Sequence, residues 1–179
     1  MDDLDTINLV LLALRLIIGL GLAMHGYAKI FRGGRLEGTG GWFDSMGMRP
    51  GHVHARLAAF TEIGAGLLMA VGFLTPFAAA GFVGLMVVAF WTVHKGSGFL
   101  VASNGWEYNL VLAAIAVAFA TLGAYEYSLD SALGIVESPG DGFAGTTGFL
   151  ISVLLGLGAA ALQLGVFYKP DEVESDTSS

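Results

Sequence analysis

Few residues inside the apolar stretches of this chain could do chemistry, and they are of types that bind head groups or carry protons. His25 and Lys29 are four residues apart in the stretch "AMHGYAKIF", so on a helix they lie on one face. Imidazole and carboxyl groups can pass protons, and an ammonium group can donate a hydrogen bond to a quinone carbonyl or bind an anionic head group. The candidates for a ligand- or quinone-binding site are His25, Lys29, Glu62, His94 and Glu107. No residue is assigned a catalytic role.

The elements that must position these side chains are helices in a lipid bilayer. The chain has 179 residues, of which 55% are hydrophobic and 13% are charged, a composition too apolar for a water-soluble domain. Five apolar blocks each have about the 20 residues that a helix needs to cross the hydrocarbon, and they are too long for the strands of a membrane barrel. These blocks span 7–31, 55–74, 76–94, 106–122 and 143–168. The predicted fold is therefore an all-α, polytopic membrane helix bundle.

Charge is sorted between the two sides of this bundle. Seven of the eight Lys and Arg residues fall in the first connection, the third connection or the C-terminal tail. They are Lys29, Arg32, Arg35, Arg49, Arg56, Lys95 and Lys169. The start "MDDLD" and the segment "AYEYSLDSALGIVESPGDG" hold acids and no Lys or Arg. Because basic residues stay on the cytoplasmic side, we expect a multi-pass protein of the inner (plasma) membrane with its N-terminus outside and its C-terminus in the cytoplasm.

The predicted domain organisation has four parts. Residues 1–131 form a four-helix membrane domain with a cytoplasmic loop at 32–54. In that loop Thr39 is expected to cap a short interfacial helix that carries Trp42, Phe43 and Met46. Residues 132–142 form an extracytoplasmic linker, residues 143–168 a fifth transmembrane helix, and residues 169–179 a disordered acidic cytoplasmic tail.

Arg15 and Glu62 are charged residues near the middle of the apolar blocks. A charge there costs about 2.5 to 3.5 kcal/mol on insertion scales, so each of the two needs a partner. We expect them to form a structural ion pair with each other. His52 and His54 are two residues apart, which is about 200° around a helix, so we expect them at the surface. No metal site is predicted.

The polar residues lie in a series of short motifs. An Arg in the first helix is followed by HG-x-x-K near its end, in "LRLIIGLGLAMHGYAKIF". Further motifs follow in "GWFDSMGMRP", "TEIGAGLLMAVGFLTP", "TVHKGSGF", "NGWEYNLVLAAIA" and "YSLD". In this order they resemble the DoxX family of bacterial four-helix membrane proteins, over residues 10–131. One departure is that "GAYEYSLD" lacks the second glycine of the family's G-x-G-x-x-SLD. The fifth helix lies outside the region of resemblance.

The resemblance implies a link to membrane-bound redox complexes, with superoxide dismutase or sulfur-handling proteins as partners. The related DoxD and DoxA proteins take part in thiosulfate:quinone oxidoreduction. We therefore expect an integral membrane subunit of a redox or oxidative-stress complex, with a quinone- or lipid-head-group-binding pocket near the cytoplasmic leaflet. The chain has no cysteine and no flavin or nucleotide motif, so we expect no intrinsic cofactor, and electrons would come from a partner. Catalysis by this chain alone is not expected.

Several alternatives stay open. More remote relatives act as membrane cargo receptors or chaperones, which suggests a scaffold or assembly factor whose polar layer is structural. A small proton-linked carrier is disfavoured because the sequence shows no inverted repeat or broken helix. Ligation of a haem by His25 and His94 is a further alternative, because the two histidines are expected at the same depth on two helices. The lipid bilayer is an expected partner, no nucleic acid is expected, and a homo-oligomer is left open.

Overall fold

The computed structural model describes residues 3–135 and 142–170. The helices are α1 (Asp3–Phe31), α2 (Arg35–Ser45), α3 (Gly51–Val71), α4 (Thr75–Ala89), α5 (Glu107–Leu122), α6 (Leu129–Ala132) and α7 (Gly145–Phe167). A π-helical turn, Phe90–His94, continues α4. Over the described residues the chain forms no β-strand, only an isolated bridge between Met48 and Tyr168, so the all-α prediction is confirmed. Parts of the predicted linker and most of the predicted acidic tail lie outside the described residues.

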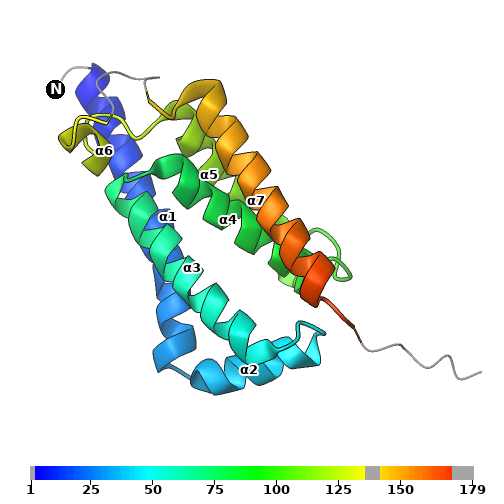
Figure 1. Cartoon of the computed structure of the whole chain (residues 1–179). Coiled ribbons are helices and arrows are strands. Elements are labelled where there is room, and N and C mark those ends of the chain that lie inside the picture. Colours follow the sequence, from blue (N-terminus) through cyan, green and yellow to red (C-terminus); the bar gives the residue numbers. More distant parts are fainter. Residues whose placement is uncertain (1–2, 136–141, 171–179) are drawn as a thin grey trace, which may run out of the picture.

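The long helices form two packed groups (Figure 1). α1 and α3 lie antiparallel as one pair, and α4 packs on both α5 and α7 as the second group. α3 packs on α4 and so connects the two groups, and α2 lies across the end of the bundle beneath α3. A core that includes Met69, Phe82, Leu112 and Phe119 fills the space between them. α3 and α7 therefore lie on either side of α4 (Figure 1).

Small residues set the distance between α1 and α3. A Cβ added at Gly19 would lie 2.5 Å from the Gly66 carbonyl oxygen, and one added at Gly66 would lie 2.5 Å from the Gly19 oxygen. A Cβ at Gly26 would likewise lie 2.5 Å from the Ala59 oxygen. Glycine therefore lets the two backbones touch, as in other tightly packed membrane helices. This contact fixes the register of α1 against α3.

The end of α7 is tied to the turn between α2 and α3. The Lys169 amide donates to the Gly47 carbonyl at 2.7 Å, and the Arg49 amide donates to the Phe167 carbonyl at 3.2 Å. These bonds form the Met48–Tyr168 bridge. The C-terminal helix is thus held by its last residues to the first half of the chain.

Three helical segments are long and apolar enough to cross a membrane: α1, Thr75–His94 and α7. α5 is apolar but shorter. The outward faces of these helices carry large apolar side chains, such as Ile17 at 68% exposed and Leu162 at 69% exposed. Side chains of this kind are stable on the outside of a protein where lipid covers them. The chain is therefore a membrane protein in contact with the lipid bilayer.

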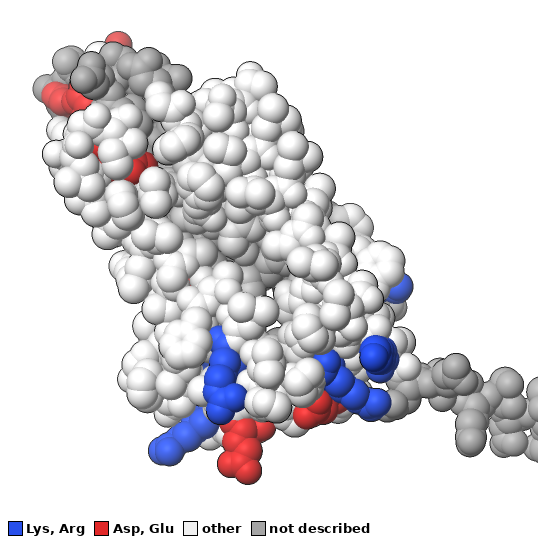
Figure 2. Space-filling model, viewed as in Figure 1, with Lys and Arg blue, Asp and Glu red and all other residues white. Residues whose placement is uncertain are grey.

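Charges lie at the two ends of the bundle (Figure 2). On the face shown, Lys and Arg gather at the end formed by α2, the start of α3 and the ends of α4 and α7, and the middle is free of charge. We call this end the basic end. Acidic residues of the first turn of α1 and of the 125–130 segment lie at the opposite end. The sidedness expected from this distribution stays a prediction.

The segment between α1 and α3 differs from the expected loop at 32–54. α2 has eleven residues and begins at Arg35, and α3 begins at Gly51, four residues earlier than expected. Thr39 does not cap a helix, because its hydroxyl lies inside α2 and donates to the Arg35 carbonyl at 2.8 Å. The glycine-rich composition of this segment hid its helical content, since glycine disfavours helix where packing does not compensate.

Candidate functional site

Lys29 and Glu62 form an ion pair at the basic end of the α1–α3 pair. The Lys29 Nζ lies 2.7 Å from each carboxylate oxygen of Glu62. The Lys29 side chain is 22% exposed and that of Glu62 is 11% exposed. The pair forms because Gly26, three residues before Lys29, packs directly on Ala59 and Glu62. The last turn of α1 is thereby placed beside the middle of α3.

The expected ion pair between Arg15 and Glu62 is not formed. In the antiparallel register Gly26 faces Ala59 and Glu62, whereas Arg15 faces Gly72 at the end of α3. Eleven residues separate position 15 from position 26, which is about 16 Å along a helix. That distance is too long for the two charges to meet. The register depends on the glycine contacts, which the spacing of charges in the sequence does not reveal.

Arg15 instead forms part of a closed cluster with the segments that follow α3 and α5, which we call the Arg15 clamp and define by Arg15, Gly72, Leu74, Tyr127 and Asp130. The fully buried Arg15 donates from Nη2 to the Tyr127 carbonyl. A Cβ at Gly72 would overlap the guanidinium, so only glycine fits there. Asp130 accepts from the Leu74 amide at 3.0 Å and donates its own amide to the Gly72 carbonyl at 3.0 Å. The "YSLD" motif is therefore the partner of the Arg in the first helix.

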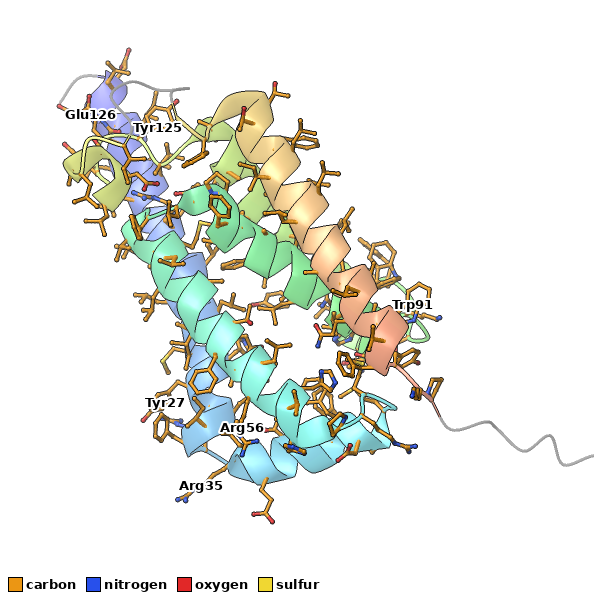
Figure 3. The ribbon with its side chains drawn as sticks, in the orientation of Figure 1. Tyr27, Arg35, Arg56, Trp91, Tyr125 and Glu126 are labelled. Carbon is orange, nitrogen blue, oxygen red and sulfur yellow. The ribbon has the colours of Figure 1, made fainter. Side chains whose placement is uncertain are left out.

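The first turns of α1 extend this contact. Asn8 donates from Nδ2 to a Glu126 carboxylate oxygen at 3.3 Å, and the Glu126 amide donates to Asn8 Oδ1 at 3.3 Å. Figure 3 shows Tyr125 and Glu126 beside the start of α1, with Arg35 and Arg56 at the opposite end. The 125–130 segment thus attaches to α1 through Asn8 with Glu126, through Arg15 with the Tyr127 carbonyl, and through the Tyr127 hydroxyl, which donates to Asp5 at 3.5 Å.

A cavity of about 580 Å³ lies between α3, α4 and α7 and reaches α2 and Lys29. Its walls are mostly aliphatic and aromatic, from Phe77 at one end of α4 to Thr92 at the other. Among the described residues, Lys29 and Glu62 are the charged groups that line it. Its other polar groups include Trp42, Thr61, Thr92 and Gln163. Thr61 and Glu62 lie in the middle of α3. The other polar lining residues lie toward the basic end, so the cavity is polar there and apolar toward Phe77.

The prediction that His54 lies at the surface is wrong, because this residue is 1% exposed. Its Nδ1 lies 3.0 Å from Gln163 Nε2, and its ring packs on the ring of Phe167 with 5.0 Å between centroids. Gln163 and Phe167 also line the cavity. His54 therefore joins α3 to α7 behind the cavity wall. This contact could not be predicted from local sequence, because the partner lies on a helix 109 residues away.

The structure brings together only part of the predicted set of five. Lys29 and Glu62 meet, and His25 is exposed on α1 near enough to act electrostatically on Glu62. His94 and Glu107 do not line the cavity. The His94 ring lies 2.7 Å from the Asn104 carbonyl, and Glu107 accepts from the Val101 amide at 3.0 Å. Both side chains shape the loop between α4 and α5. The bond to Asn104 engages Nδ1 and leaves Nε2, as in many metal-ligating histidines, so the haem alternative stays a prediction.

Residues 10–95 match the family model of DoxX. This stretch, just under half of the chain, is similar to a DoxX domain. The match includes the "HGYAK" and "TEIGAG" motifs, with Arg15, Lys29 and Glu62, and ends at Lys95. The later motifs, "NGWEYN" and "YSLD", lie outside the matched residues, as does α7.

A curated relative covers part of the chain, and its description names no function. An uncharacterized protein of Haemophilus influenzae is 30% identical over 82 residues, which cover 46% of this chain and 54% of that protein. The chain thus spans about half the length of the curated relative that it matches. No solved structure gives a significant match. The cavity combines walls from the residues that match the DoxX model, namely α2, α3 and α4, with one wall, α7, from outside the matched residues.

Proposed function

We propose that this DoxX protein is an integral membrane subunit of a redox complex and that its cavity holds an isoprenoid quinone. The observation that carries the proposal is the cavity between α3, α4 and α7, which is apolar along most of its length and has the Lys29–Glu62 pair among its lining. An amphiphile with a small polar head and an apolar tail matches this distribution. The family resemblance supports the redox assignment.

The dimensions of the cavity suit such a ligand. Its volume of about 580 Å³ is in the range of ordinary small-molecule sites. The wall from Phe77 to Thr92 is about 22 Å long at the rise of a helix, long enough for a head group and several isoprene units. In this proposal the tail lies along α4 and α7, and the head group lies beside Thr61 and Lys29.

The polar residues then have defined roles. A quinone supplies the capacity to take up two electrons and two protons. The Lys29 ammonium and the Thr61 hydroxyl donate hydrogen bonds to its carbonyl oxygens, while the apolar walls exclude water from the head group. Glu62 holds Lys29 in place. In this proposal the electrons come from a partner protein, for which superoxide dismutase or sulfur-handling proteins are the candidates that the resemblance suggests.

The proposal includes a topology. Five helices, α1, α3, α4, α5 and α7, cross the membrane, the N-terminus lies outside, and the basic end lies at the cytoplasmic leaflet of an inner membrane. The concentration of Lys and Arg at the basic end supports this orientation. The head group of the ligand would then lie toward the cytoplasmic half of the bilayer.

Trp42 provides a direct test, because it lines the cavity whereas Trp91 and Trp106 do not. In full-length protein carrying Trp91→Phe and Trp106→Phe, we expect decyl-ubiquinone to quench the Trp42 fluorescence in a saturable way. Ala159→Phe places a ring into the cavity and should abolish the saturable part. Leu154→Phe, on the exposed face of the same helix, is the matched control and should leave it unchanged. Quenching that is linear in quinone, or equal in both variants, would contradict the proposal.

A scaffold or assembly factor is the second candidate. The observation in its favour is the Arg15 clamp, in which a fully buried charge donates to one backbone carbonyl and does not line the cavity. Purification in mild detergent followed by mass spectrometry separates the two candidates. A scaffold retains its protein partners when Ala159→Phe fills the cavity and yields no quinone from the wild type, whereas the quinone protein yields quinone that this variant loses.

A further inference from the structure

We infer that the cavity selects a neutral head group over an anionic one, and that Glu62 sets this selectivity by neutralising Lys29. The inference rests on the proposed function, because it concerns the ligand class of the same cavity. It goes further in that it assigns a specificity-determining role to one carboxylate. It also predicts how a single substitution converts the ligand preference.

The geometry of the ion pair is the first observation. Both oxygens of Glu62 lie 2.7 Å from the Lys29 Nζ, so the ammonium contacts both oxygens that share the negative charge. Within the described part of the chain no other Lys, Arg, Asp or Glu lines the cavity. The net charge of the lining is therefore zero while the pair is ionised. A cavity that binds phosphate or carboxylate head groups would instead need an unpaired cation.

The neutral polar groups give the second observation. The Thr92 hydroxyl donates to the Val88 carbonyl at 2.9 Å, and the amide nitrogen of Gln163 lies 3.0 Å from His54. This leaves the Thr92 oxygen and the Gln163 carbonyl oxygen as acceptors, and Thr61 as a hydroxyl donor or acceptor. Such groups bind carbonyls and hydroxyls well. They do not compensate a full negative charge placed among apolar walls.

An anionic head group would also meet direct competition. To bind Lys29 it would have to approach the same ammonium as Glu62, and two like charges a few ångströms apart repel strongly in a poorly solvated site. A neutral carbonyl can accept a remaining ammonium N–H without disturbing the pair. His25, which acts on Glu62 from α1, is exposed and does not line the cavity. The other basic residues of the basic end lie outside the lining and do not change this balance.

The test uses two probes that differ by one negative charge and one methyl group, 9,10-dibromostearate and its methyl ester, whose bromines quench tryptophan on contact. Full-length protein that retains Trp42 as its one tryptophan is titrated in maltoside micelles at alkaline pH, with each probe expressed as its mole fraction in the micelle. In the wild-type cavity we expect the ester to bind about tenfold more tightly than the carboxylate. Glu62→Gln frees the charge of Lys29 and should reverse the order, with carboxylate binding improved about tenfold.

Two further variants keep the result interpretable. Lys29→Met combined with Glu62→Gln removes both charges and the ammonium donor, so it should weaken the ester and show no gain for the carboxylate. Lys29→Gln leaves Glu62 alone and should weaken the carboxylate further, which gives a second reading should Glu62→Gln not fold. Failure of both probes to give saturable quenching in the wild-type cavity would overturn the proposed function itself. Saturable quenching with equal affinities, or with the carboxylate tighter, would overturn the selectivity and leave the cavity proposal standing.

Discussion

The two ionic sites of this protein differ in what surrounds them, although both lie along the interface of α1 with its neighbours. Arg15 is fully buried and is bound by the backbone of the 125–130 segment at the acidic end. Lys29 is partly exposed, pairs with a side chain, and lines a cavity at the basic end. A charge enclosed by backbone can only hold segments together, whereas a charge beside a cavity can also reach a ligand. The surroundings of each charge, and not its residue type, therefore distinguish the structural site from the candidate ligand site.

The largest effect on stability is expected from Arg15→Met. It removes the donor to the Tyr127 carbonyl and the cation that faces Asp130, which leaves buried polar groups without compensation. Breaking a buried charged contact costs about 3–5 kcal/mol. We expect a large fall in Tm, measured by circular dichroism in detergent. Arg35→Met removes an exposed charge and serves as the control. Equal Tm values for the two variants would show that the clamp does not stabilise the fold.

Gly19→Val tests the interface that lies between the two sites. The new side chain would overlap the Gly66 carbonyl oxygen, so α1 and α3 must separate, at a cost of about 1–3 kcal/mol. Gly21→Val is the matched control, because a Cβ at Gly21 meets no atom within 4 Å. We expect the Gly19 variant alone to melt earlier. If the Gly21 variant loses as much stability, helix propensity and not close packing explains the result.

Lys29→Met should lower stability less than Arg15→Met does, because Lys29 is partly exposed whereas Arg15 is fully buried. Its effect on ligand binding should be much larger, because it removes the donor at the polar end of the cavity. Paired measurements of Tm and of Trp42 quenching by decyl-ubiquinone check this. A fall in Tm as large as that of Arg15→Met, with quenching unchanged, would make Lys29 structural and remove the contrast between the two sites.

The two sites are also expected on opposite sides of the membrane. Because the chain has no cysteine, single cysteines can report sidedness without background. Ser45→Cys and Ser103→Cys at the basic end should label from the cytoplasm, and Thr146→Cys at the start of α7 should label from outside. These exposed positions should leave stability unchanged. Cytoplasmic labelling of Thr146→Cys would reverse or abolish the proposed topology.

Much of the fold follows from the sequence because the signals are local. Block length and small residues predicted helices, and the observed α1, α5 and α7 end within a few residues of the expected blocks. The residues that matter at the candidate site were also singled out, since Arg15, Lys29 and Glu62 are expensive to place in an apolar helix. These three residues could be identified because charged residues are rare in the apolar helices.

The pairing of those residues could not be predicted, because it depends on register. Glycine contacts between α1 and α3 decide that Glu62 meets Lys29 and that Arg15 meets the segment after α5. His54 shows the same limit, since a histidine near a helix start is buried only because Gln163 and Phe167 come back to it from α7. The cavity is a product of three helices and has no counterpart in any one stretch of sequence.

The most direct measurement of the central claim is the amount of quinone that co-purifies with each variant from native membranes in mild detergent, determined by mass spectrometry per molecule of folded protein. Wild-type protein and Arg32→Met, which removes an exposed charge just after α1, should retain quinone at the same level. Lys29→Met should lose most of it, with a smaller fall in Tm than that of Arg15→Met. Quinone that is absent from the wild type, or equal in all three proteins, would contradict the assignment of the Lys29–Glu62 end of the cavity as the ligand site.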